Sequence, residues 1–309
     1  MAMKNGAPLV LAATFGLALK GIWARFAYAE GLDVAGVLFY RSAFSAPLVL
    51  FGGLYLMKKE RLVSNNSLSW RDYGPGIALG ALFSVGMKCD FEAIERLGAS
   101  VSRVILFAFP LVVLILDASA TGRMPERKRL AGFLLAWLGL LLVAVGQSSS
   151  IERQLDDLPW ALASMGLYAL FVWASGKVTQ TLGSVRLTMS SNLATAAVVL
   201  LFVLGTHSGA APVASNSALA WILVMVFVST VAPYFLMTEG IKRLGATDAS
   251  LLAMSGPLVT LVAGFILLGE SLTSMQLLGT AVTILGVGVS QGRWKRMSAE
   301  NRPLVPGHS

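Results

Sequence analysis

Long apolar stretches alternate with short polar breaks along almost the whole chain. A helix needs about 20 mostly apolar residues to cross the hydrocarbon core of a bilayer. The breaks carry charged or turn-forming residues, such as the segments 58–61 and 122–125. The pattern predicts an all-α polytopic membrane protein with ten transmembrane helices and no soluble domain. These helices are expected at residues 8–28, 34–57, 73–94, 99–121, 129–146, 158–177, 185–205, 218–241, 247–268 and 274–291.

Composition excludes a soluble enzyme, because 56% of the residues are hydrophobic and only 13% are charged, against roughly 25% charged in soluble proteins. One cysteine, Cys89, and two histidines leave no basis for a disulfide framework or a Cys- or His-based metal centre. The chain has neither a phosphate-binding glycine loop followed by Lys-Ser/Thr nor a Ser/His/Asp set. We therefore expect neither enzymatic activity nor a cofactor.

The positions of Lys and Arg predict the orientation, because basic residues in short loops stay in the cytoplasm. With the N-terminus inside, the outside loops contain only Arg96 and Arg153 as basic residues. Both termini are then cytoplasmic, and residues 292–309 form a cytoplasmic tail. In a soluble domain the net charge of +8 would suggest nucleic acid as a partner. Here most of the basic residues orient helices, so no nucleic-acid partner is expected.

The chain repeats itself at a constant offset of 147 residues, which places 92–99 on 239–246 and Pro110 on Pro257. The earlier helices align at an offset of 150, where Trp23 falls on Trp173. The two repeats, 8–146 and 158–291, each contain five predicted helices. Because five is odd, the second copy must insert upside down, and such inverted repeats are typical of secondary transporters.

These features together resemble the EamA family of the drug/metabolite transporter superfamily. The resemblance is carried by Trp23, Tyr40-Arg41, the prolines of the fourth and ninth helices, and the segments 267–270 and 276–279. It implies an inner-membrane carrier that exports amino acids, metabolites or drugs. One departure is that Arg123 stands where the second repeat has Glu270, so the role of that glutamate is not shared by both halves.

Basic residues inside the membrane cost about 3 kcal/mol each, so they usually face a cavity and pair. Three charged residues near the outer interface, Arg25, Glu92 and Arg103, could instead reach the headgroups. Lys88 and Glu92 are four residues apart and close enough to pair. Lys20, Arg41 and Lys88 lie deeper in the membrane. For these three residues we expect side chains that face a cavity, with structural ion pairing as the alternative. Five basic residues lie within the predicted spans, all in the outer half: Lys20, Arg25, Arg41, Lys88 and Arg103.

The second repeat has uncharged residues at the positions equivalent to these charges. This asymmetry predicts a cationic cavity that binds the carboxylate or other anionic group of a small metabolite, with Asp90 balancing the charge or binding an ammonium group or a proton. Aromatic residues and Asn192 could line the same pathway, although membrane aromatics more often face lipid or pack. The predicted substrate-binding residues are Lys20, Trp23, Tyr40, Arg41, Phe44, Lys88, Asp90, Trp173, Asn192 and Tyr234.

A second group of residues is predicted to act at gates or helix interfaces. The prolines interrupt helical hydrogen bonding and could act as hinges or simply fix the helix shape. The acidic residues near the inner ends could form polar contacts or a gate. These residues are Glu92, Arg103, Pro110, Asp117, Glu239 and Pro257.

The sequence thus predicts a carrier that works by alternating access and exports a small amino-acid-like or organic-anion metabolite, either passively or in exchange for protons. Uptake or exchange of an anionic metabolite by the same fold is the alternative. A membrane-embedded enzyme or a channel fits less well, and a homodimer stays open. The expected partners are a small-molecule substrate and the lipid bilayer.

Overall fold

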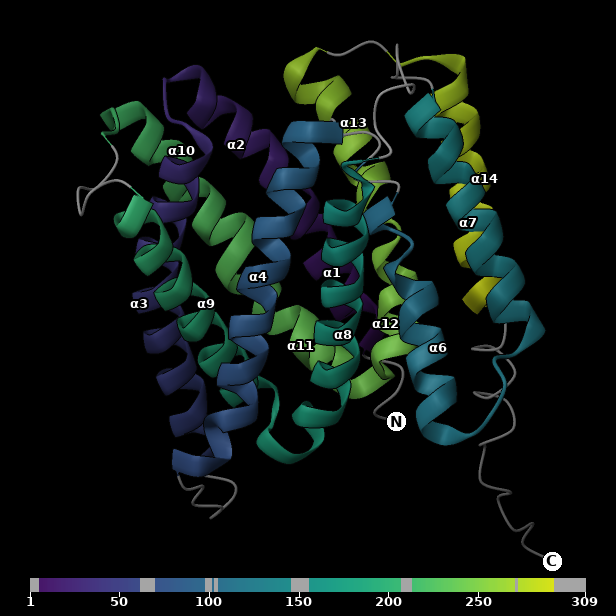
Figure 1. Ribbon diagram of the computed structural model, residues 1–309, viewed down its shortest axis with the longest axis horizontal. Coiled ribbons are helices and arrows are strands. Elements are labelled where there is room, and N and C mark those ends of the chain that lie inside the picture. The colour runs from purple at the N-terminus through teal and green to yellow at the C-terminus, as the bar shows by residue number, and fades with distance from the viewer. Residues whose placement is uncertain are drawn as a thin grey trace, which may run out of the picture.

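The protein is a bundle of helices in the computed structural model, which describes residues 6–61, 70–97, 102, 105–145, 156–206, 213–269 and 272–291 (Figure 1). The first half contains α1 (Gly6–Ala18), α2 (Lys20–Ala29), α3 (Val34–Arg61), the short η2 (Trp70–Tyr73), α4 (Gly74–Leu97), α6 (Phe109–Thr121) and α7 (Arg127–Val145). The second half contains α8 (Leu158–Leu182), α9 (Ser184–Thr206), α10 (Asn216–Val226), η3 (Phe227–Val231), α11 (Ala232–Leu244), α12 (Ala246–Ala253), α13 (Gly256–Leu268) and α14 (Ser274–Gln291).

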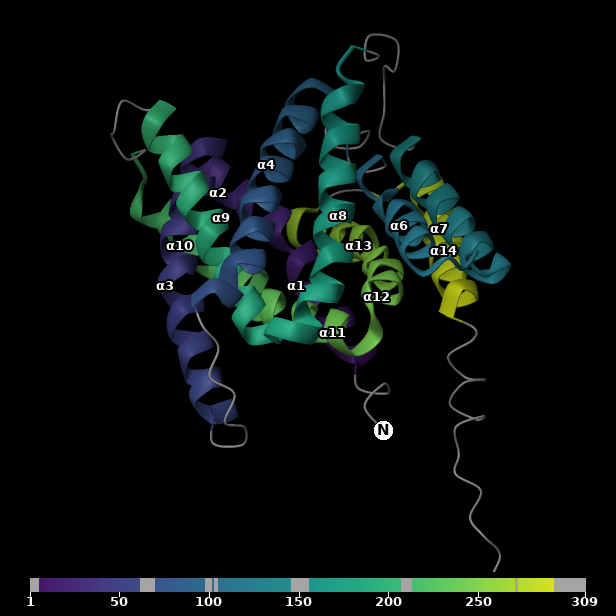
Figure 2. The same cartoon turned by 60° about the horizontal axis from the view of Figure 1, so that its bottom comes forward.

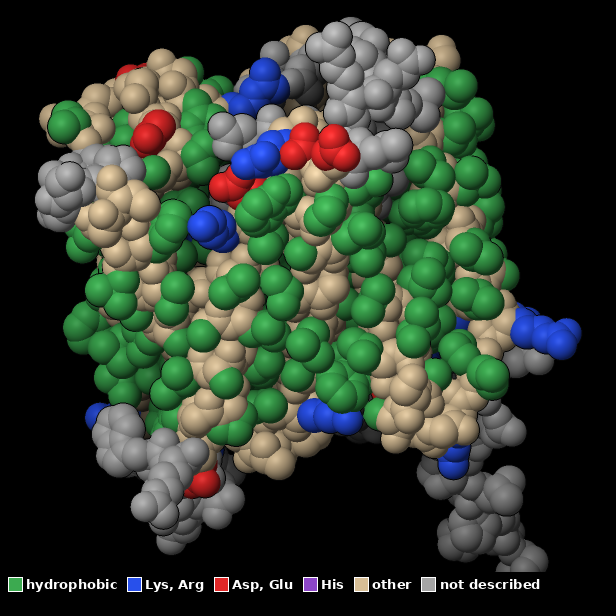
Figure 3. Space-filling view, in the orientation of Figure 1, with side chains coloured by type: hydrophobic (Ala, Val, Ile, Leu, Met, Phe, Trp, Pro, Cys, Tyr) green, Lys and Arg blue, Asp and Glu red, His purple; other side chains and the backbone are tan. Residues whose placement is uncertain are grey.

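These elements form ten membrane spans, as the hydropathy pattern predicts. The first span is α1 with α2, the eighth is α10 with η3 and α11, and the ninth is α12 with α13. Six helices in the described part of the chain are long and apolar enough to cross a membrane by length and composition, and α6 and α14 add shorter apolar helices. Hydrophobic side chains cover most of the face in Figure 3, and charged ones gather toward its upper and lower ends. A bilayer therefore solvates the middle of the bundle.

Helices α7 and α14 lie side by side in both views (Figures 1 and 2), and their pairing shows how the two halves are related. A Cβ atom added at Gly139 would lie 2.5 Å from the carbonyl oxygen of Gly279, and one added at Gly286 would lie 2.7 Å from that of Gly132. These four glycines are equivalent in pairs at the offset of 147, and the contacts run in opposite directions along the two helices. Equivalent helices are thus antiparallel, as inverted repeats require.

Helix ends repeat in the two halves as well. Helix α6 ends at Gly122 with φ 65°, and α13 ends at the equivalent Gly269 with φ 66°. Only glycine adopts this left-handed conformation without a steric penalty, and it commonly ends helices this way. A glycine in the left-handed conformation therefore ends the helix at equivalent positions in the fourth and ninth spans.

Several spans are interrupted near the middle of the bundle. The first span changes direction at Leu19, and the fourth and ninth are interrupted before Pro110 and Pro257, where the equivalent residues Ala108 and Ser255 share nearly the same φ and ψ. In the eighth span, the π-helix η3 precedes Pro233. Proline lacks a backbone donor, so each of these three prolines is tolerated in the first turn of a new helical segment.

The interrupted spans are in contact with one another. Helix α1 packs against α11, η3, α12 and α13, and Thr260 Oγ1 donates a hydrogen bond of 3.0 Å to the carbonyl oxygen of Ala18 at the end of α1. Irregular backbone inside a membrane is tolerated where protein covers it. The middle of the bundle is therefore built from helix ends, which lie next to the site described below.

The glycine contact between α7 and α14 predicts a difference between two alanine substitutions in the same helix. In Gly286→Ala the new Cβ would lie 2.2 Å from the backbone nitrogen of Ala136, so the helices must separate at a cost of about 1–3 kcal/mol. In Gly288→Ala nothing lies within 4 Å, and the better helix propensity of alanine should leave the stability equal or higher. Thermal unfolding of the purified variants in detergent checks this, and equal midpoints for the two variants would contradict it.

Candidate functional site

A polar pocket lies between the two halves. One wall is α3 of the first half, and the other walls come from α9, η3 and α11 of the second half. Its empty volume is about 210 Å³. Repeat interfaces near the middle of the membrane are where secondary transporters bind their substrates. The pocket is lined by Arg41, Ser42, Ser45, Asn192, Thr195, Ala196, Thr230 and Tyr234.

Arg41 is the one charged side chain among these lining residues, and only 5% of it is exposed. Within the described part of the chain no carboxylate forms an ion pair with it, and its Nη2 donates to the thioether sulphur of Met87 at 3.1 Å. A thioether is a weak acceptor, whereas a guanidinium has five N–H donors. A buried cation without an anion is costly, so this guanidinium is suited to an anionic ligand.

Asn192 of α9 lines the same pocket as Arg41, and 8% of it is exposed. Its Oδ1 atom is fully buried and has no hydrogen-bond partner among the described residues. The neighbouring Thr195 hydroxyl donates to a backbone carbonyl oxygen. Its Oγ1 lies 2.9 Å from the oxygen of Gly80 and 2.8 Å from that of Ser191. The pocket therefore presents both free N–H donors and a free amide acceptor.

The local fold at η3 shapes this pocket. The wider π-turn lets Thr230 Oγ1 bond to the carbonyl oxygen of Met225, five residues earlier, at 3.3 Å. The neighbouring Ser229 accepts a 3.1 Å hydrogen bond from Trp23 Nε1 of α2. π-Helical turns are frequent at functional sites. Here the turn supplies a pocket residue on one side and ties η3 to the first span on the other.

Three of the predicted substrate-binding residues line the pocket, namely Arg41, Asn192 and Tyr234. Three others, Trp23, Tyr40 and Phe44, pack beside it in a cluster with α10. Trp23 stacks on Trp221, with ring centroids 6.2 Å apart. These aromatic residues support the wall of the pocket.

The remaining four predicted substrate-binding residues do not line the pocket. Lys20 begins α2 and Asp90 lies on α4, both half-buried, and Trp173 of α8 has Lys177 Nζ 3.8 Å from its ring centroid. Lys88 is exposed, and its Nζ lies 4.7 Å from the ring centroid of Phe202 on α9. Substrate binding by these four residues stays a prediction.

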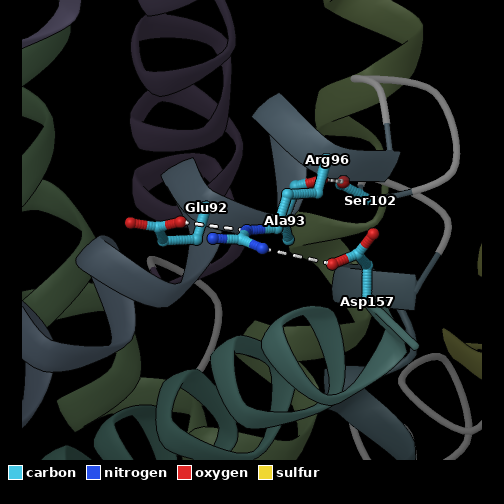
Figure 4. Close-up of polar contacts among 5 residues, drawn as sticks. All are labelled: Glu92, Ala93, Arg96, Ser102 and Asp157. Atoms are coloured by element: carbon cyan, nitrogen blue, oxygen red, sulfur yellow. Dashed lines mark hydrogen bonds and ion pairs between the residues drawn. The ribbon is translucent and has the colours of Figure 1, made fainter. Parts of the chain in front are cut away.

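The predicted ion pair between Lys88 and Glu92 is wrong. Glu92 Oε2 instead pairs with Arg96 Nε at 3.1 Å, and Arg96 Nη1 also reaches Asp157 Oδ1 at 3.4 Å (Figure 4). Lys88 and Arg96 are each four residues from Glu92 on α4, so either could pair with it by spacing alone. Asp157 at the start of α8 decides between them, because it draws the Arg96 side chain toward a position where it bridges two carboxylates.

This cluster connects α4 with α8 at the upper end of the bundle in Figure 1. Figure 4 shows Arg96 between Glu92 and Asp157, with Ser102 donating to the carbonyl oxygen of Ala93 at 2.7 Å. The ion pair between Arg96 and Asp157 joins α4 to the start of α8, and because these side chains are partly exposed its contribution to stability is small. Arg103, another of the residues predicted to act at a gate or helix interface, lies outside the described residues.

Polar contacts join helices at the lower end. Asp117 Oδ2 at the end of α6 accepts a 3.2 Å hydrogen bond from Thr247 Oγ1 on α12. Arg129 Nη2 on α7 lies 3.2 Å from Asp248 Oδ1 on the same α12. These contacts connect the fourth and fifth spans of the first half to the ninth span of the second.

Glu239 of α11 forms a second lower contact. Its Oε2 accepts a hydrogen bond of 2.5 Å from the Ser184 hydroxyl at the start of α9, and its Oε1 pairs with Arg243 Nε at 2.6 Å. Glu239 and Asp117 thus both join spans at this end, and their role as a gate stays a prediction. A gating role for Pro110 and Pro257, which lie in the first turns of α6 and α13, likewise stays a prediction.

Five pocket residues are not among those predicted from the sequence, and four of them carry a hydroxyl group: Ser42, Ser45, Thr195 and Thr230, with Ala196 as the fifth. Serine and threonine are common in membrane helices, so composition gives no signal for them. Helical spacing from the residues already singled out does give one, since i,i+3 and i,i+4 neighbours share a face. Such spacing links Arg41 to Ser45, Asn192 to Thr195, and Tyr234 to Thr230.

A second cavity, with an empty volume of about 300 Å³, lies between α6, α8, α11 and α12. Apolar and aromatic side chains dominate its wall, and none of its lining residues is charged. It offers nothing to neutralise a charged metabolite, so the Arg41 pocket is the candidate site.

The sequence profile of the EamA-like transporter family matches residues 4–145 and 158–290, which is nearly the whole chain in two copies. The chain belongs to the EamA-like transporter family. It is therefore a multi-pass membrane transporter and not an enzyme. The EamA resemblance read from the sequence is confirmed.

Similar proteins carry transporter names. The chain is 29% identical over 284 residues to the "Uncharacterized transporter YcbK" of Bacillus subtilis, covering 89% of this chain and 88% of that protein. It is 26% identical over 241 residues to the "Probable amino-acid metabolite efflux pump" of Salmonella typhimurium, covering 70% and 78%. A solved crystal structure superposes with a TM-score of 0.75 over 95% of this chain and 99% of its own, at 16% identity, which shows a shared fold.

The burial of Arg41 without a carboxylate predicts an unusual stability effect. Replacing it by methionine removes an uncompensated charge and keeps the apolar volume, so the ligand-free protein should be as stable as wild type or more stable by up to about 4 kcal/mol. Arg129→Met is the contrasting variant, because it leaves Asp248 without its partner and should lower stability.

Thermal unfolding in detergent without added metabolites compares the two. A midpoint for Arg41→Met that falls as far as that of Arg129→Met would mean that Arg41 already has a structural counter-charge.

Proposed function

We propose that this EamA-family transporter is an inner-membrane secondary carrier that exports a small amino-acid-like or organic-anion metabolite by alternating access. The observation that carries the proposal is Arg41, a buried cation with no carboxylate partner in the described structure, in a pocket between the two halves. Two Salmonella typhimurium relatives support it. One is named a "Probable amino-acid metabolite efflux pump", and the other is the "Uncharacterized inner membrane transporter YicL", 28% identical over 200 residues.

Orientation is part of the same proposal. The excess of Lys and Arg in the segments at one end supports a cytoplasmic location of both termini. The lower end of Figure 1, where α1 begins, then faces the cytoplasm. Residues 292–309 would form the cytoplasmic tail; they lie outside the described residues.

Alternating access follows from the inverted repeats. Two halves with the same fold in opposite orientations can exchange conformations, which opens the site first to one side and then to the other. The interruptions before Pro110 and Pro257 occupy equivalent places in the two halves and would let the segments on either side tilt separately. The contacts of Asp117 and Arg129 with α12 would close the cytoplasmic side and break when it opens.

Uptake or exchange of an anionic metabolite is the second candidate, and the same pocket favours it. Arg41 binds an anion equally well from either side, and the gradients across the membrane set the net direction. The movement is either passive or coupled to protons.

Flux measurements test the carrier proposal. Untargeted metabolite profiling of cells and medium, with and without the protein, identifies the cargo and its direction. In proteoliposomes, wild type should then show saturable counterflow of that cargo. Arg41→Met should lower it at least about 100-fold, because a charge-assisted contact is lost. Arg25→Met, an exposed arginine in the same outer half, is the matched control and should retain it.

Unsaturable conductance by the wild-type protein would instead indicate a channel. Equal counterflow by Arg41→Met and wild type would remove Arg41 from the transport path.

A reversible cross-link tests the lower gate. In Asp117→Cys/Thr247→Cys on a Cys89→Ser background, the two cysteines replace side chains whose oxygens lie 3.2 Å apart. Oxidation should lock α6 to α12 and cut counterflow to about a tenth or less, if opening requires these helices to separate. Reduction should restore the flux of the same sample. Unchanged flux after complete cross-linking would show that the helices do not move apart during transport.

A further inference from the structure

Arg186 lies in the first turn of α9, which begins at the lower end of the bundle in Figure 1. The side chain is half-buried, and its Nε atom is fully buried without a hydrogen-bond partner. Within the described part of the chain no carboxylate forms an ion pair with it. We infer that Arg186 binds the phosphate group of one anionic phospholipid. This inference goes beyond the proposed function and does not depend on it.

The packing of α9 places Arg186 between α3 and α4. One turn further along α9, Met189 lies against Gly53 of α3, and Ser190 lies against Gly76 of α4. Both contacts are so close that neither glycine has room for a side chain. Arg186 precedes Met189 by three residues and Ser190 by four, so it shares their face of the helix. The guanidinium group therefore lies near the inner ends of α3 and α4.

The guanidinium geometry suits a phosphate group. The Nε–H and one Nη–H of an arginine point in the same direction and can donate two parallel hydrogen bonds to two oxygens of one phosphate. A buried donor without an acceptor lowers stability. The buried Nε of Arg186 therefore marks the side of the guanidinium on which the ligand binds.

The uncommitted charges near this end of α9 are positive. Lys58, near the end of α3, is exposed and forms no ion pair with a described residue. The acidic side chains described on α11 and η2, which both pack against α9, have partners of their own. Glu239 pairs with Arg243, and Asp72 is held by another contact. A lipid with a net negative charge therefore fits this site better than a zwitterionic lipid.

Exposed apolar side chains next to the site favour a lipid over a free anion. Leu54 follows Gly53 on α3 and is 48% exposed, and Ile77 follows Gly76 on α4 and is 52% exposed. Both lie one turn deeper in the membrane than Arg186, where acyl chains would run below a bound phosphate. Basic sites between helices at the cytoplasmic side are typical binding places for anionic lipid headgroups. The orientation proposed above puts this end of the bundle in that leaflet.

Lipid binding to the delipidated full-length protein, measured by native mass spectrometry, tests this inference. The probes are phosphatidylglycerol, phosphatidylethanolamine with the same acyl chains, and glycerol 3-phosphate. The variants are Arg186→Gln and Arg186→Lys. Arg127→Gln is the matched control, because Arg127 also lies in the first turn of a helix but is exposed. Thermal unfolding without lipid separates a loss of binding from a loss of folding.

Wild type and Arg127→Gln should bind one phosphatidylglycerol, about fivefold more tightly than phosphatidylethanolamine. Arg186→Gln should bind phosphatidylglycerol at least about tenfold more weakly than wild type, because the charge-assisted hydrogen bonds are lost. Arg186→Lys keeps the charge but has no Nε, so its affinity should lie between those of wild type and Arg186→Gln.

Equal affinity of Arg186→Gln and wild type for phosphatidylglycerol would overturn the inference. An equal loss in Arg127→Gln would do the same, since it would indicate a general attraction between basic residues and anionic lipids. Binding of glycerol 3-phosphate as tight as that of the lipid would identify a site for a soluble anion and would also overturn it. The carrier proposal is judged separately, by saturable counterflow through the Arg41 pocket.

Discussion

A peptide group inside a bilayer has no water to bond with, so it must find its partner within the protein. This constraint explains why the spans are helical, and it also limits where a helix can be interrupted. In the described structure the interruptions lie at Leu19, before Pro110 and Pro257, and at the π-helix η3. They gather around the first span, where other helices cover the exposed backbone groups. The middle of the protein is consequently the one region where polar groups can be presented to a cargo at acceptable cost.

The scaffold is symmetric, but its chemistry is not. Gly139 meets Gly279 and Gly132 meets Gly286, so the same close contact occurs twice at the crossing of α7 and α14. Arg41, by contrast, aligns with the uncharged Ser191 of the second half, and the second half contributes Asn192 to the pocket instead. Symmetry supplies two interconvertible conformations, and the difference between the halves supplies a site shaped for an asymmetric molecule.

Much of the fold could be predicted from the sequence, because the lengths of the apolar segments and the internal repeat are both visible in the sequence. Arg41 could also be predicted as a site residue, because burying a charge far from the membrane interface costs free energy and such residues are usually functional. For Lys88 the sequence indicates the depth in the membrane but not whether the side chain faces the pocket. The face of α4 on which Lys88 lies depends on how α4 packs against α9. Likewise the spacing allowed Glu92 to pair with either neighbour, and Asp157, brought near by the fold, decides for Arg96. The π-helix leaves no mark in the hydrophobic pattern, so the placement of Thr230 in the pocket required the structure.

The most direct test of the account is a cryo-EM map of the protein saturated with the metabolite that it transports. We expect ligand density in the pocket between α3, α9 and η3, with an anionic group within hydrogen-bonding distance of the Arg41 guanidinium. Density in the apolar cavity between α6, α8, α11 and α12, with the Arg41 pocket empty, would contradict it.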